Sequence, residues 1–599
     1  MDRNIDRITA SKWGIPAILT CVLYLKSLIL LFSLYEFSAR VFLLSFLGIA
    51  PILLIVSFSF LFEDRRKWMF FFVVDLVLSI ILYSDLAYFR GLNRLFSVYV
   101  LFIKNLTFDL GASAGEFTFQ MDFVMLIDLP LIVYILRRNK KLAKNQGYVM
   151  KKEPFTRRRL LFGTSFTLSF VLMMTQIFAM YRTEGMENYA NHALLLSPVG
   201  NHLVNMASFV AEKTTTLRDV DLGNIDSWYD KNLTNLNADP SSEDLFGILE
   251  GKNIIVIHFE SLESFVLNES FYGKEITPNL NRILNSSISF TGIHEQVREG
   301  TSSDTELMFN TGLYPTMKGS AFMSYGNNEY FALPKLLKTK GYETMSLHGD
   351  DAKFWNRDVV YPNMGIDKYV DEQLFEDKRY SGLGILDESL FEQSEKELDK
   401  ATSPFYSYIT TVTSHMPFSL EKEYRTLDIP GDNPDMRYLE TIHYTDAYLG
   451  EFYDSLEEKG LLENSAFIIF GDHEGLHKYY ESELPDNDKK LPFIISVPGM
   501  EGIEIDTTGG QVDMLPTLLY LMGVKKDVYS RKVMGRNLLR TGPGSVILPS
   551  GEILGEPRNE EHLKRATEIS NLILAGDYFG EGHSNKVNHE PERTDESPE

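Results

Sequence analysis

The first 181 residues hold several apolar runs, and these runs constrain the fold more than any other feature of the sequence. A helix of about 20 residues crosses the roughly 30 Å hydrocarbon core of a bilayer. Four runs reach about that length: 13–32, 41–62, 68–88 and 160–181. A shorter run, 123–136, contains Asp128 and Pro130, and we count it as a fifth span. Because a secretory signal has one short apolar core, the recurring runs predict a five-helix transmembrane domain over residues 1–181.

Basic residues in the short loops predict the orientation of this domain, because Lys and Arg are retained on the cytoplasmic side. Ten such residues lie between positions 137 and 159, and smaller groups are Arg3, Arg7 and Lys12, then Arg65, Arg66 and Lys67. Five spans place all three groups in the cytoplasm and everything after Tyr181 outside the cell. Since the densest group lies between two apolar runs, topology explains it better than nucleic-acid binding does. We expect no nucleic-acid partner.

The chain after residue 181 contains no cysteine, because the single Cys21 lies in the first apolar run. Disulfides therefore cannot stabilise the outer part, which needs a core of its own. The formal charge of -24, despite the basic loop, shows that this part is acidic. We divide it into a linker with short helices (182–247), a large domain (248–540) and a polar tail (541–599) that we expect to be at least partly disordered.

From residue 253 onward, β-branched apolar runs alternate with amphipathic stretches that end at Gly. This alternation predicts an α/β domain with a mixed, mainly parallel sheet between helices. The expected strands are 253–260, 342–348, 404–415, 465–473 and 491–499. The expected helices are 302–313, 332–341, 438–460 and 512–523.

Polar residues follow three of the expected strands, where ligands bind in open α/β sheets. Glu260 ends the first strand, His415 follows another, and Asp472 with His473 follows a third. A single Glu at such a point is commonly a helix cap, and a single His is commonly a packed residue. The Asp-His pair between two glycines is more specific, because adjacent carboxylate and imidazole groups suit a turn around a cation.

Thr301 lies in the stretch "REGTSSDTELM", directly after Gly300 and ahead of a helical pattern. A threonine hydroxyl is a poor nucleophile unless a metal or a base assists the loss of its proton. The alternative is a helix cap, since Asp304 three residues later fits the capping-box pattern, and capping is compatible with catalysis. Together with Glu260, Asp472 and His473, Thr301 would form an oxygen-rich ligand set that suits manganese, magnesium or zinc.

These segments together resemble one known family. They are Glu260 after its strand, "EGTSSDTE" around Thr301, "HGDDAKFWNRD" at 348–358, "SHMPF" around His415, "GDHEG" at 471–475 and "GGQVDMLPTLLYLMG" at 509–523. Their joint occurrence, in this order, resembles the lipoteichoic acid synthase family, a branch of the sulfatase and alkaline phosphatase superfamily. The resemblance implies a multi-pass membrane domain followed by an extracellular α/β domain of alkaline-phosphatase or sulfatase type.

The resemblance also implies roles for individual residues. Glu260, Thr301, Asp472 and His473 would bind one catalytic manganese ion, and Thr301 would be the nucleophile as well. The positions that would line the glycerophosphate site are His348, Asp350, Trp355, Arg357 and His415. Arg357 can fork onto phosphate oxygens, and His415 can exchange a proton with an alcohol. Two alternatives stay open: Trp355 as a packed residue and Arg357 as the partner of a structural acid.

The implied reaction takes glycerol phosphate from phosphatidylglycerol through a threonine-linked intermediate and releases diacylglycerol. The acceptor would be a lipoteichoic acid chain or its glycolipid anchor, so polymerase and primase roles both stay open. Family members can be released by signal peptidase, but residues 204–213 offer small residues without an A-x-A site. The oligomeric state is equally open.

Three other functions remain as alternatives. A true sulfatase carries its nucleophile in a C/S-x-P-x-R sequence, whereas "TSSDT" has neither the Pro nor the Arg. A phosphoethanolamine transferase typically has a disulfide-rich, zinc-dependent outer domain, which the lack of cysteines here disfavours. An inactive scaffold has no physical need for a nucleophile beside a metal.

Overall fold

The computed structural model describes residues 14–34, 39–92, 95–98, 118–145, 154–183, 189–214, 217–236 and 245–580, with gaps at 383, 428, 487, 498, 540–541 and 558. The basic N-terminal group, Lys151, Lys152 and the tail after residue 580 lie outside these ranges. The chain divides into two compact units, Met1–Val100 with Leu110–Glu212 and Leu101–Asp109 with Lys213–Glu599. Each unit has its own buried hydrophobic cluster.

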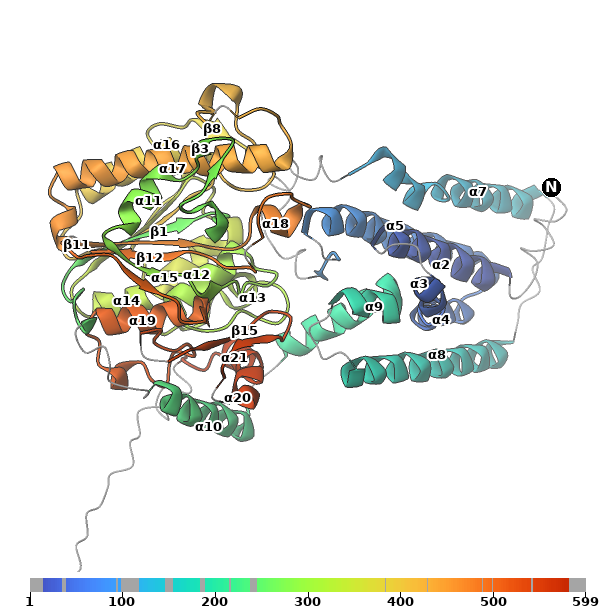
Figure 1. The fold of residues 1–599 in the computed structure, drawn as a ribbon. Helices are drawn as coiled ribbons and strands as arrows, with labels where there is room; N and C mark the ends of the chain where they lie inside the picture. The colour runs from blue at the N-terminus through green and yellow to red at the C-terminus, as the bar shows by residue number, and fades with distance from the viewer. Residues whose placement is uncertain are drawn as a thin grey trace, which may run out of the picture. The chain divides into compact units, whose positions relative to one another are not determined.

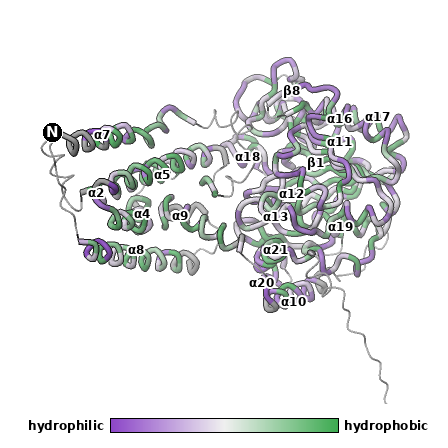
Figure 2. The backbone as a smooth tube through the Cα atoms, turned by 180° about the vertical axis from the view of Figure 1, so that it is seen from behind, coloured by the Kyte–Doolittle hydropathy of each residue, from purple (hydrophilic) through white to green (hydrophobic). Residues whose placement is uncertain are grey.

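Four helical segments of the first unit are long and apolar enough to cross a membrane, and apolar residues dominate them in Figure 2. The segments are Ile15–Leu34, Val41–Leu61, Arg66–Arg90 and Phe155–Phe178. They belong to α2 (Gly14–Leu34), to α3 (Ala39–Ser45) with α4 (Ile49–Ser57) and η1 (Phe58–Leu61), to α5 (Asp64–Leu92), and to α8 (Phe155–Thr183). Four of the five predicted spans therefore coincide with helical segments that are long and apolar enough to cross a membrane.

The fifth predicted span, 123–136, is not among these four segments. It divides between η3 (Gln120–Leu126) and α7 (Leu129–Asn145), with Asp128 and Pro130 at the junction. The second half of α7 is basic in sequence, so its apolar part covers about eight residues, or roughly 12 Å of helix. This is too short to cross a bilayer alone. The five-span topology, and the orientation that depends on it, stay predictions.

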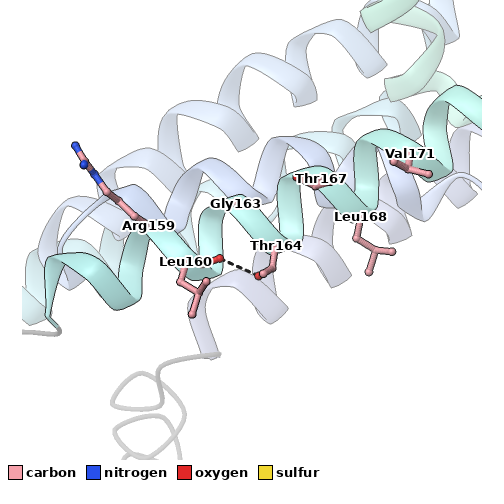
Figure 3. Close-up of a pocket in the computed structure, with 7 residues that line it drawn as sticks. All are labelled: Arg159, Leu160, Gly163, Thr164, Thr167, Leu168 and Val171. Carbon is pink, nitrogen blue, oxygen red and sulfur yellow. Dashed lines mark hydrogen bonds between the residues drawn. The ribbon is translucent and has the colours of Figure 1, made fainter.

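The outward face of α8 carries an open groove (Figure 3). Its lining is Arg159, Leu160, Gly163, Thr164, Thr167, Leu168 and Val171. The Thr164 hydroxyl donates a hydrogen bond to the Leu160 carbonyl at 2.9 Å, one turn earlier. Because the helix itself satisfies this hydroxyl, it adds no unmet polar group to a surface that would face lipid.

A buried ion cluster connects three segments of the first unit. The Lys26 ammonium of α2 lies 2.8 Å from Asp75 Oδ1 of α5 and 2.7 Å from Asp128 Oδ1, just before α7. It also donates a hydrogen bond to the Ser79 hydroxyl at 2.7 Å. Lys26 and Asp75 are 4% and 0% exposed. Ionisable groups inside an apolar helix bundle are costly unless they are paired, so Lys26 fixes how these segments pack.

Replacing Lys26 by Met should destabilise the first unit by about 3 kcal/mol or more, because two acids would then be left without their cation. The measurement is thermal unfolding of the full chain in detergent, with hydrogen exchange of residues 64–92 as the local readout. Arg157→Met, at an exposed position of α8, serves as the control and should change little. If both variants changed the stability equally, the Lys26 cluster would stabilise the first unit no more than one surface charge does.

The second unit is built on an eight-stranded sheet with the order β13-β4-β12-β11-β1-β10-β6-β7. Its strands are β1 (Asn253–Phe259), β4 (Ser287–Phe290), β6 (Glu343–His348), β7 (Lys368–Val370), β10 (Phe405–Thr410), β11 (Ser465–Gly471), β12 (Phe493–Ser496) and β13 (Ile503–Ile505). From β11 to β7 every neighbouring pair is parallel, whereas β12 is antiparallel to both β11 and β4. The predicted mixed, mainly parallel sheet is confirmed.

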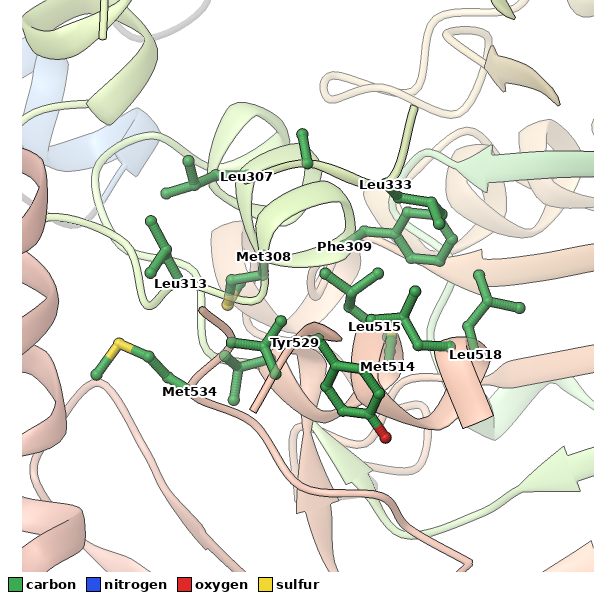
Figure 4. Close-up of a cluster of buried hydrophobic side chains, with 14 of the residues drawn as sticks. Leu307, Met308, Phe309, Leu313, Leu333, Met514, Leu515, Leu518, Tyr529 and Met534 are labelled. Atoms are coloured by element: carbon green, nitrogen blue, oxygen red, sulfur yellow. The ribbon is translucent and has the colours of Figure 1, made fainter. Parts of the chain in front are cut away.

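Helices cover both faces of this sheet (Figure 1). One face carries α11 (Pro278–Leu284), α16 (Asp387–Leu398) and α17 (Pro434–Glu458), and the other carries α12 (Ser302–Thr311), α14 (Leu333–Lys338) and α19 (Met514–Leu521). Leu307, Met308 and Phe309 of α12 belong to the same hydrophobic cluster as Leu515 and Leu518 of α19 (Figure 4). Since α12 starts directly after Thr301, this core fixes where Thr301 lies.

The predicted boundary at residue 540 is wrong, because the chain beyond it is part of the folded unit. Residues up to 580 form β15 (Ser545–Ile547), β16 (Ile553–Gly555), α20 (Glu560–Lys564) and α21 (Ala566–Ala575). Ile547, Ile569 and Leu574 lie in the core cluster. These elements are short and their apolar residues are scattered among polar ones, so the sequence shows no sustained pattern there.

The predicted linker contains two long helices, α9 (Tyr189–Lys213) and α10 (Asp219–Leu236). The Trp228 ring of α10 stacks on His562 of α20 with ring centroids 4.3 Å apart. Its indole N–H donates to the His562 carbonyl at 3.0 Å. Thus α10 belongs to the second unit rather than to a connector. Residues 204–213, the stretch considered for release by signal peptidase, are helical, and release stays a prediction.

Candidate active site

The carboxyl ends of four parallel strands lie together at one edge of the sheet. His258 of β1 pairs with Thr410 of β10, and Thr410 pairs with His348 of β6. On the other side of β1, Phe259 pairs with Gly471 of β11. The residues that follow these strands therefore meet, as expected for a ligand site in an α/β sheet.

A buried group at this edge has the composition of a metal site. Ligand atoms of His258, Glu260 and Asp472 all lie within 4.8 Å of one another. His473 Nε2 lies 3.4 Å from Glu260 Oε1 and 3.5 Å from Asp472 Oδ2. Glu260, Asp472 and His473, three of the predicted ligands, are thus brought together, and His258 joins them.

The electrostatics of this group fit one divalent cation. Burial and the neighbouring Asp472 raise the pKa of Glu260 well above its usual value. Burial alone would raise the pKa of Asp472 too, but His473 and His258 lower it. His258 Nε2 and Asp472 Oδ2 lie 3.1 Å from each other, and within the described part of the chain neither atom makes a hydrogen bond that satisfies it. Two buried carboxylates beside imidazole nitrogens are a donor set that a hard or borderline divalent metal satisfies.

Hydrogen bonds orient the carboxylates of this group. Glu260 accepts from the Ser261 hydroxyl at 2.9 Å and from the Ser302 hydroxyl at 3.1 Å. Asp472 Oδ1 accepts from the backbone N–H groups of Ser261 and His473, at 2.7 and 2.8 Å. Such outer contacts fix the direction of the remaining lone pairs. The bond from Ser302 also ties α12, and with it the neighbouring Thr301, to Glu260.

Thr301 has a strained backbone at the start of α12, with φ 41° and ψ −117°. Its side chain makes no capping hydrogen bond, so the capping-box interpretation is wrong. The Asp304 carboxylate instead accepts from the backbone N–H groups of Arg298 and Gly300, at 2.9 and 3.0 Å. A Cβ atom on Gly300 would lie 2.1 Å from Asp304 Oδ1, so this turn requires glycine. Strain of this kind is held in place by the surrounding structure and is common at functional sites.

Two of the residues predicted for the glycerophosphate site, Arg357 and His415, act electrostatically on a third, His348. The pKa of His348 is lowered well below its usual value, first by burial and then by the charge of Arg357, with smaller effects of His258 and His415. The charge of Asp472 in turn acts on His415. Nδ1 of His348 bonds to the Thr410 carbonyl at 2.9 Å, and Nδ1 of His415 bonds to the Met416 carbonyl at 2.6 Å. Both rings therefore donate from Nδ1, which leaves Nε2 as an acceptor.

Arg357 is paired with an acid, as one alternative for this residue anticipated. It is 1% exposed and its Nη2 donates to Glu306 Oε1 at 2.6 Å. Its Nη1 has no partner in the described structure. Trp355 is half-buried in η6 (Phe354–Asn356), has a φ of 53° and packs on the edge of the core. Asp350 is buried, and its carboxylate accepts from the backbone N–H of Asp351 at 2.6 Å.

Comparison with known proteins identifies the family. Residues 1–201 match the lipoteichoic acid synthase N-terminal domain, and residues 252–524 match the sulfatase domain, which together cover well over half of the chain. Lipoteichoic acid synthase of Staphylococcus aureus (strain USA300) is 29% identical over 573 residues, which cover 88% of this chain and 87% of that protein. The lipoteichoic acid synthase LtaP of Listeria monocytogenes has a crystal structure with a TM-score of 0.52 and 26% identity, covering 58% of this chain and 98% of that one. The chain belongs to the lipoteichoic acid synthase family.

Two residues of this family member's site were missed by the sequence analysis. His258 lies in β1 and Glu260 directly follows it, two positions later, so the alternation of side chains along an expected strand 253–260 would have put both on one side and could have revealed His258. Glu306 had no such signal, because a glutamate in an amphipathic pattern is usually exposed. Only the structure shows that it is 0% exposed and bound to Arg357.

A third buried acid, Glu263, binds the loop that carries Asp472 and His473. Glu263 Oε1 accepts from the backbone N–H groups of Gly475 and Leu476, at 3.1 and 2.7 Å. Glu263 Oε2 bonds His477 Nδ1 at 2.6 Å. Burial would lower the pKa of His477, but the hydrogen bond and charge of Glu263 outweigh it and raise the pKa to about 9.

Stability of the second unit should fall as pH rises from 6.5 to about 9. In this window His477 keeps its proton in the folded state and has lost it in the unfolded state, so folding binds a proton. The loss should be roughly 2 kcal/mol after solvent screening. Hydrogen exchange of residues 465–480 in the full chain, measured across this range, gives the slope. His477→Gln should flatten it, and His443→Gln, which removes a ring bonded to the Ile276 carbonyl, should not. An unchanged slope in His477→Gln would contradict the assignment.

Divalent metal should stabilise the second unit through the group around Glu260 and Asp472. At a metal concentration 100 times Kd the gain is about 2.7 kcal/mol, because metal binds the folded state selectively. The measurement is thermal unfolding of the full chain in detergent with and without Mn²⁺. Asp472→Asn should abolish the gain, and the exposed Asp399→Asn should keep it. If Mn²⁺ still stabilised Asp472→Asn, the metal would bind at a site other than the group around Glu260 and Asp472.

Proposed function

We propose that this protein transfers glycerol phosphate from phosphatidylglycerol to a lipoteichoic acid chain or its glycolipid anchor, through an intermediate on Thr301. The names of the relatives support glycerophosphate transfer in lipoteichoic acid synthesis. One observation carries the proposal. Thr301 has a strained backbone and a hydroxyl that does not cap its helix, and its neighbour Ser302 binds Glu260 of the metal group. A hydroxyl so placed is suited to attack an ester beside a metal.

The metal would be held by Glu260, Thr301, Asp472 and His473, with His258 as a further candidate ligand. We propose Mn²⁺, with Mg²⁺ and Zn²⁺ as alternatives that the donor set also suits. When bound, the ion lowers the pKa of a coordinated hydroxyl and offsets negative charge on phosphoryl oxygens. The dipole of α12, whose N-terminus is at Ser302, would also favour an anion at the same place.

In the first step, Thr301 Oγ1 forms a bond to the phosphorus of phosphatidylglycerol, and the bond from phosphorus to the diacylglycerol oxygen breaks. The Thr301 proton leaves and the diacylglycerol oxygen takes one up. In the second step a hydroxyl of the acceptor attacks the phosphorus, and Thr301 Oγ1 leaves and regains a proton. Burial lowers the pKa of His415, so its Nε2 is available at neutral pH to accept the proton of that alcohol.

Arg357 and Trp355 would bind the glycerophosphate group. Nη1 of Arg357 retains an N–H edge for a phosphate oxygen, because Glu306 occupies Nε and Nη2. Trp355 presents a half-buried ring for the glycerol carbons. His348 and Asp350 add hydrogen-bonding groups for the glycerol hydroxyls. We further propose that the apolar helices anchor the protein in the cell membrane with its N-terminus inside and this site outside.

Other reactions of the superfamily are less well supported. A sulfatase-like hydrolase needs a formylglycine sequence that "TSSDT" does not provide. A phosphoethanolamine-type transferase would use the same threonine chemistry, and it differs in the donor lipid. The choice of donor is therefore the point to test, together with the choice between chain and anchor as acceptor.

Incubation with phosphatidylglycerol and Mn²⁺ should add the mass of one glycerol phosphate group to the full chain and release diacylglycerol. Thr301→Ala should gain no mass, because it lacks the attacking oxygen, whereas Thr301→Ser should retain some labelling. The exposed Thr291→Ala is the matched control and should behave like the wild type. Intact-mass spectrometry and lipid chromatography measure both products.

Phosphatidylethanolamine in a parallel sample separates the two transferase reactions. If only phosphatidylethanolamine formed an adduct, it would be the donor instead of phosphatidylglycerol. An adduct that persists in Thr301→Ala would refute Thr301 as the nucleophile. Adding a glycolipid or a short polyglycerolphosphate acceptor then shows which one removes the adduct.

A further inference from the structure

Glu306 is a buried acid to which neither the resemblance nor the reaction scheme gives a role. It lies in α12, five residues after Thr301, and is 0% exposed. Its Oε1 accepts from Arg357 Nε at 3.0 Å and from Nη2 at 2.6 Å. Its Oε2 accepts from the Tyr361 hydroxyl at 2.7 Å. Two edges of the acid are thus bound, and one of them is the guanidinium proposed to receive the phosphate.

The Arg357–Glu306 ion pair leaves the residues proposed to bind phosphate with no excess positive charge. Burial would lower the pKa of Arg357, but Glu306 raises it well above its usual value, so the guanidinium stays charged beside the Glu306 carboxylate. His348 and His415 both have lowered pKa values, chiefly because of burial, and are neutral at pH 7. Asp350 adds a further acid to the same region. Apart from the metal, the charge of Arg357 is therefore already cancelled.

We propose that Glu306 is a positioning residue that sets the charge selectivity of the site, so that it accepts a singly charged phosphodiester and disfavours a doubly charged phosphomonoester. This inference rests on the proposed function, because it takes Arg357 as a phosphate ligand. A phosphomonoester carries close to two negative charges at neutral pH, and a diester carries one. Moving the second charge into a buried site costs desolvation energy that a cancelled guanidinium does not offset.

The arrangement gives the site a chemical reason to take a lipid diester in the presence of free glycerol phosphate. Both compounds offer the same glycerol and phosphoryl oxygens to Arg357 and Trp355. At the phosphoryl group the lipid carries a diacylglycerol ester and one charge less than glycerol phosphate, and this charge difference is the quantity that Glu306 controls. If Glu306 only filled space, replacing it with glutamine would weaken the binding of both compounds to the same extent.

The test compares binding of glycerol phosphate and of its methyl ester, a monoester and a diester of nearly the same shape. Calorimetry on the Mn²⁺-loaded full chain in detergent gives both Kd values, and the ratio is the readout. The wild type should prefer the methyl ester. Glu306→Gln should shift the ratio toward glycerol phosphate by about tenfold or more, because Arg357 is then uncompensated. Tyr361→Phe removes the other hydrogen bond to Glu306 without changing charge and should leave the ratio unchanged.

The double variant Glu306→Gln with Arg357→Gln replaces the buried ion pair with a neutral pair and should return the ratio toward the wild-type value. It also keeps the test decisive if Glu306→Gln alone fails to fold. A ratio that stays the same in Glu306→Gln, or that fails to return in the double variant, overturns the inference. Binding of neither ligand to the wild type overturns it as well.

Diacylglycerol release from phosphatidylglycerol is measured on the same samples. A wild type that shows the expected ratios but releases no diacylglycerol refutes the proposed donor and keeps the role of Glu306. If the wild type releases diacylglycerol but Glu306→Gln leaves the ratio of the two Kd values unchanged, the proposed donor is kept and the role of Glu306 is refuted.

Discussion

The site is organised by the burial of two carboxylates side by side. Glu260 and Asp472 are 3% and 0% exposed, and each raises the cost of charging the other. The protein meets this cost in part with His258 and His473 on the Asp472 side and with serine hydroxyls on Glu260. A divalent cation would meet it in full. The parallel register of β1 and β11 is what brings the two acids and both imidazoles to one point, so the donor set depends on the order of the sheet.

Helix α12 converts this local arrangement into a rigid frame. Its apolar residues Leu307, Met308 and Phe309 are fixed in the core, while its polar residues bind the functional loops. Ser302, Thr305 and Glu306 bind, in turn, the Glu260 carboxylate, the Asp472 carbonyl and Arg357. Because one packed helix carries these contacts and begins directly after Thr301, the proposed nucleophile, a proposed metal ligand and the proposed phosphate-binding residue keep their geometry together.

The sequence predicted those parts of the fold that have a regular pattern. The sheet, the residues at its carboxyl edge and four apolar spans follow from hydrophobic periodicity and from residue types just after strands. It did not predict the folded region after residue 540, where the elements are short and few apolar residues reach the core, among them Ile569, Ile573 and Leu574 of α21. Nor did it predict the pairing of Arg357 with Glu306, since residues 51 positions apart become partners only through tertiary packing. The capping role considered for Thr301 was wrong because the backbone N–H groups of Ser303 and Asp304 bond to the Gly300 and Thr301 carbonyls, at 2.9 and 3.0 Å, rather than to the Thr301 side chain.

Buried ion pairs in both units point to a common principle. A buried pair is weak evidence for stability, because apolar residues of similar volume often stabilise a core at least as well. Stability alone therefore does not account for the Lys26 cluster and the Arg357–Glu306 pair. A charged pair provides two other properties. Its hydrogen bonds fix the orientation of the side chains, and its opposite charges set the net charge of the surroundings. In the first unit direction suffices, because the ammonium decides how α2, α5 and the segment before α7 pack. In the second unit the proposed role of Arg357 would need both properties, because a phosphate ligand must be aimed at its substrate without attracting every anion of higher charge.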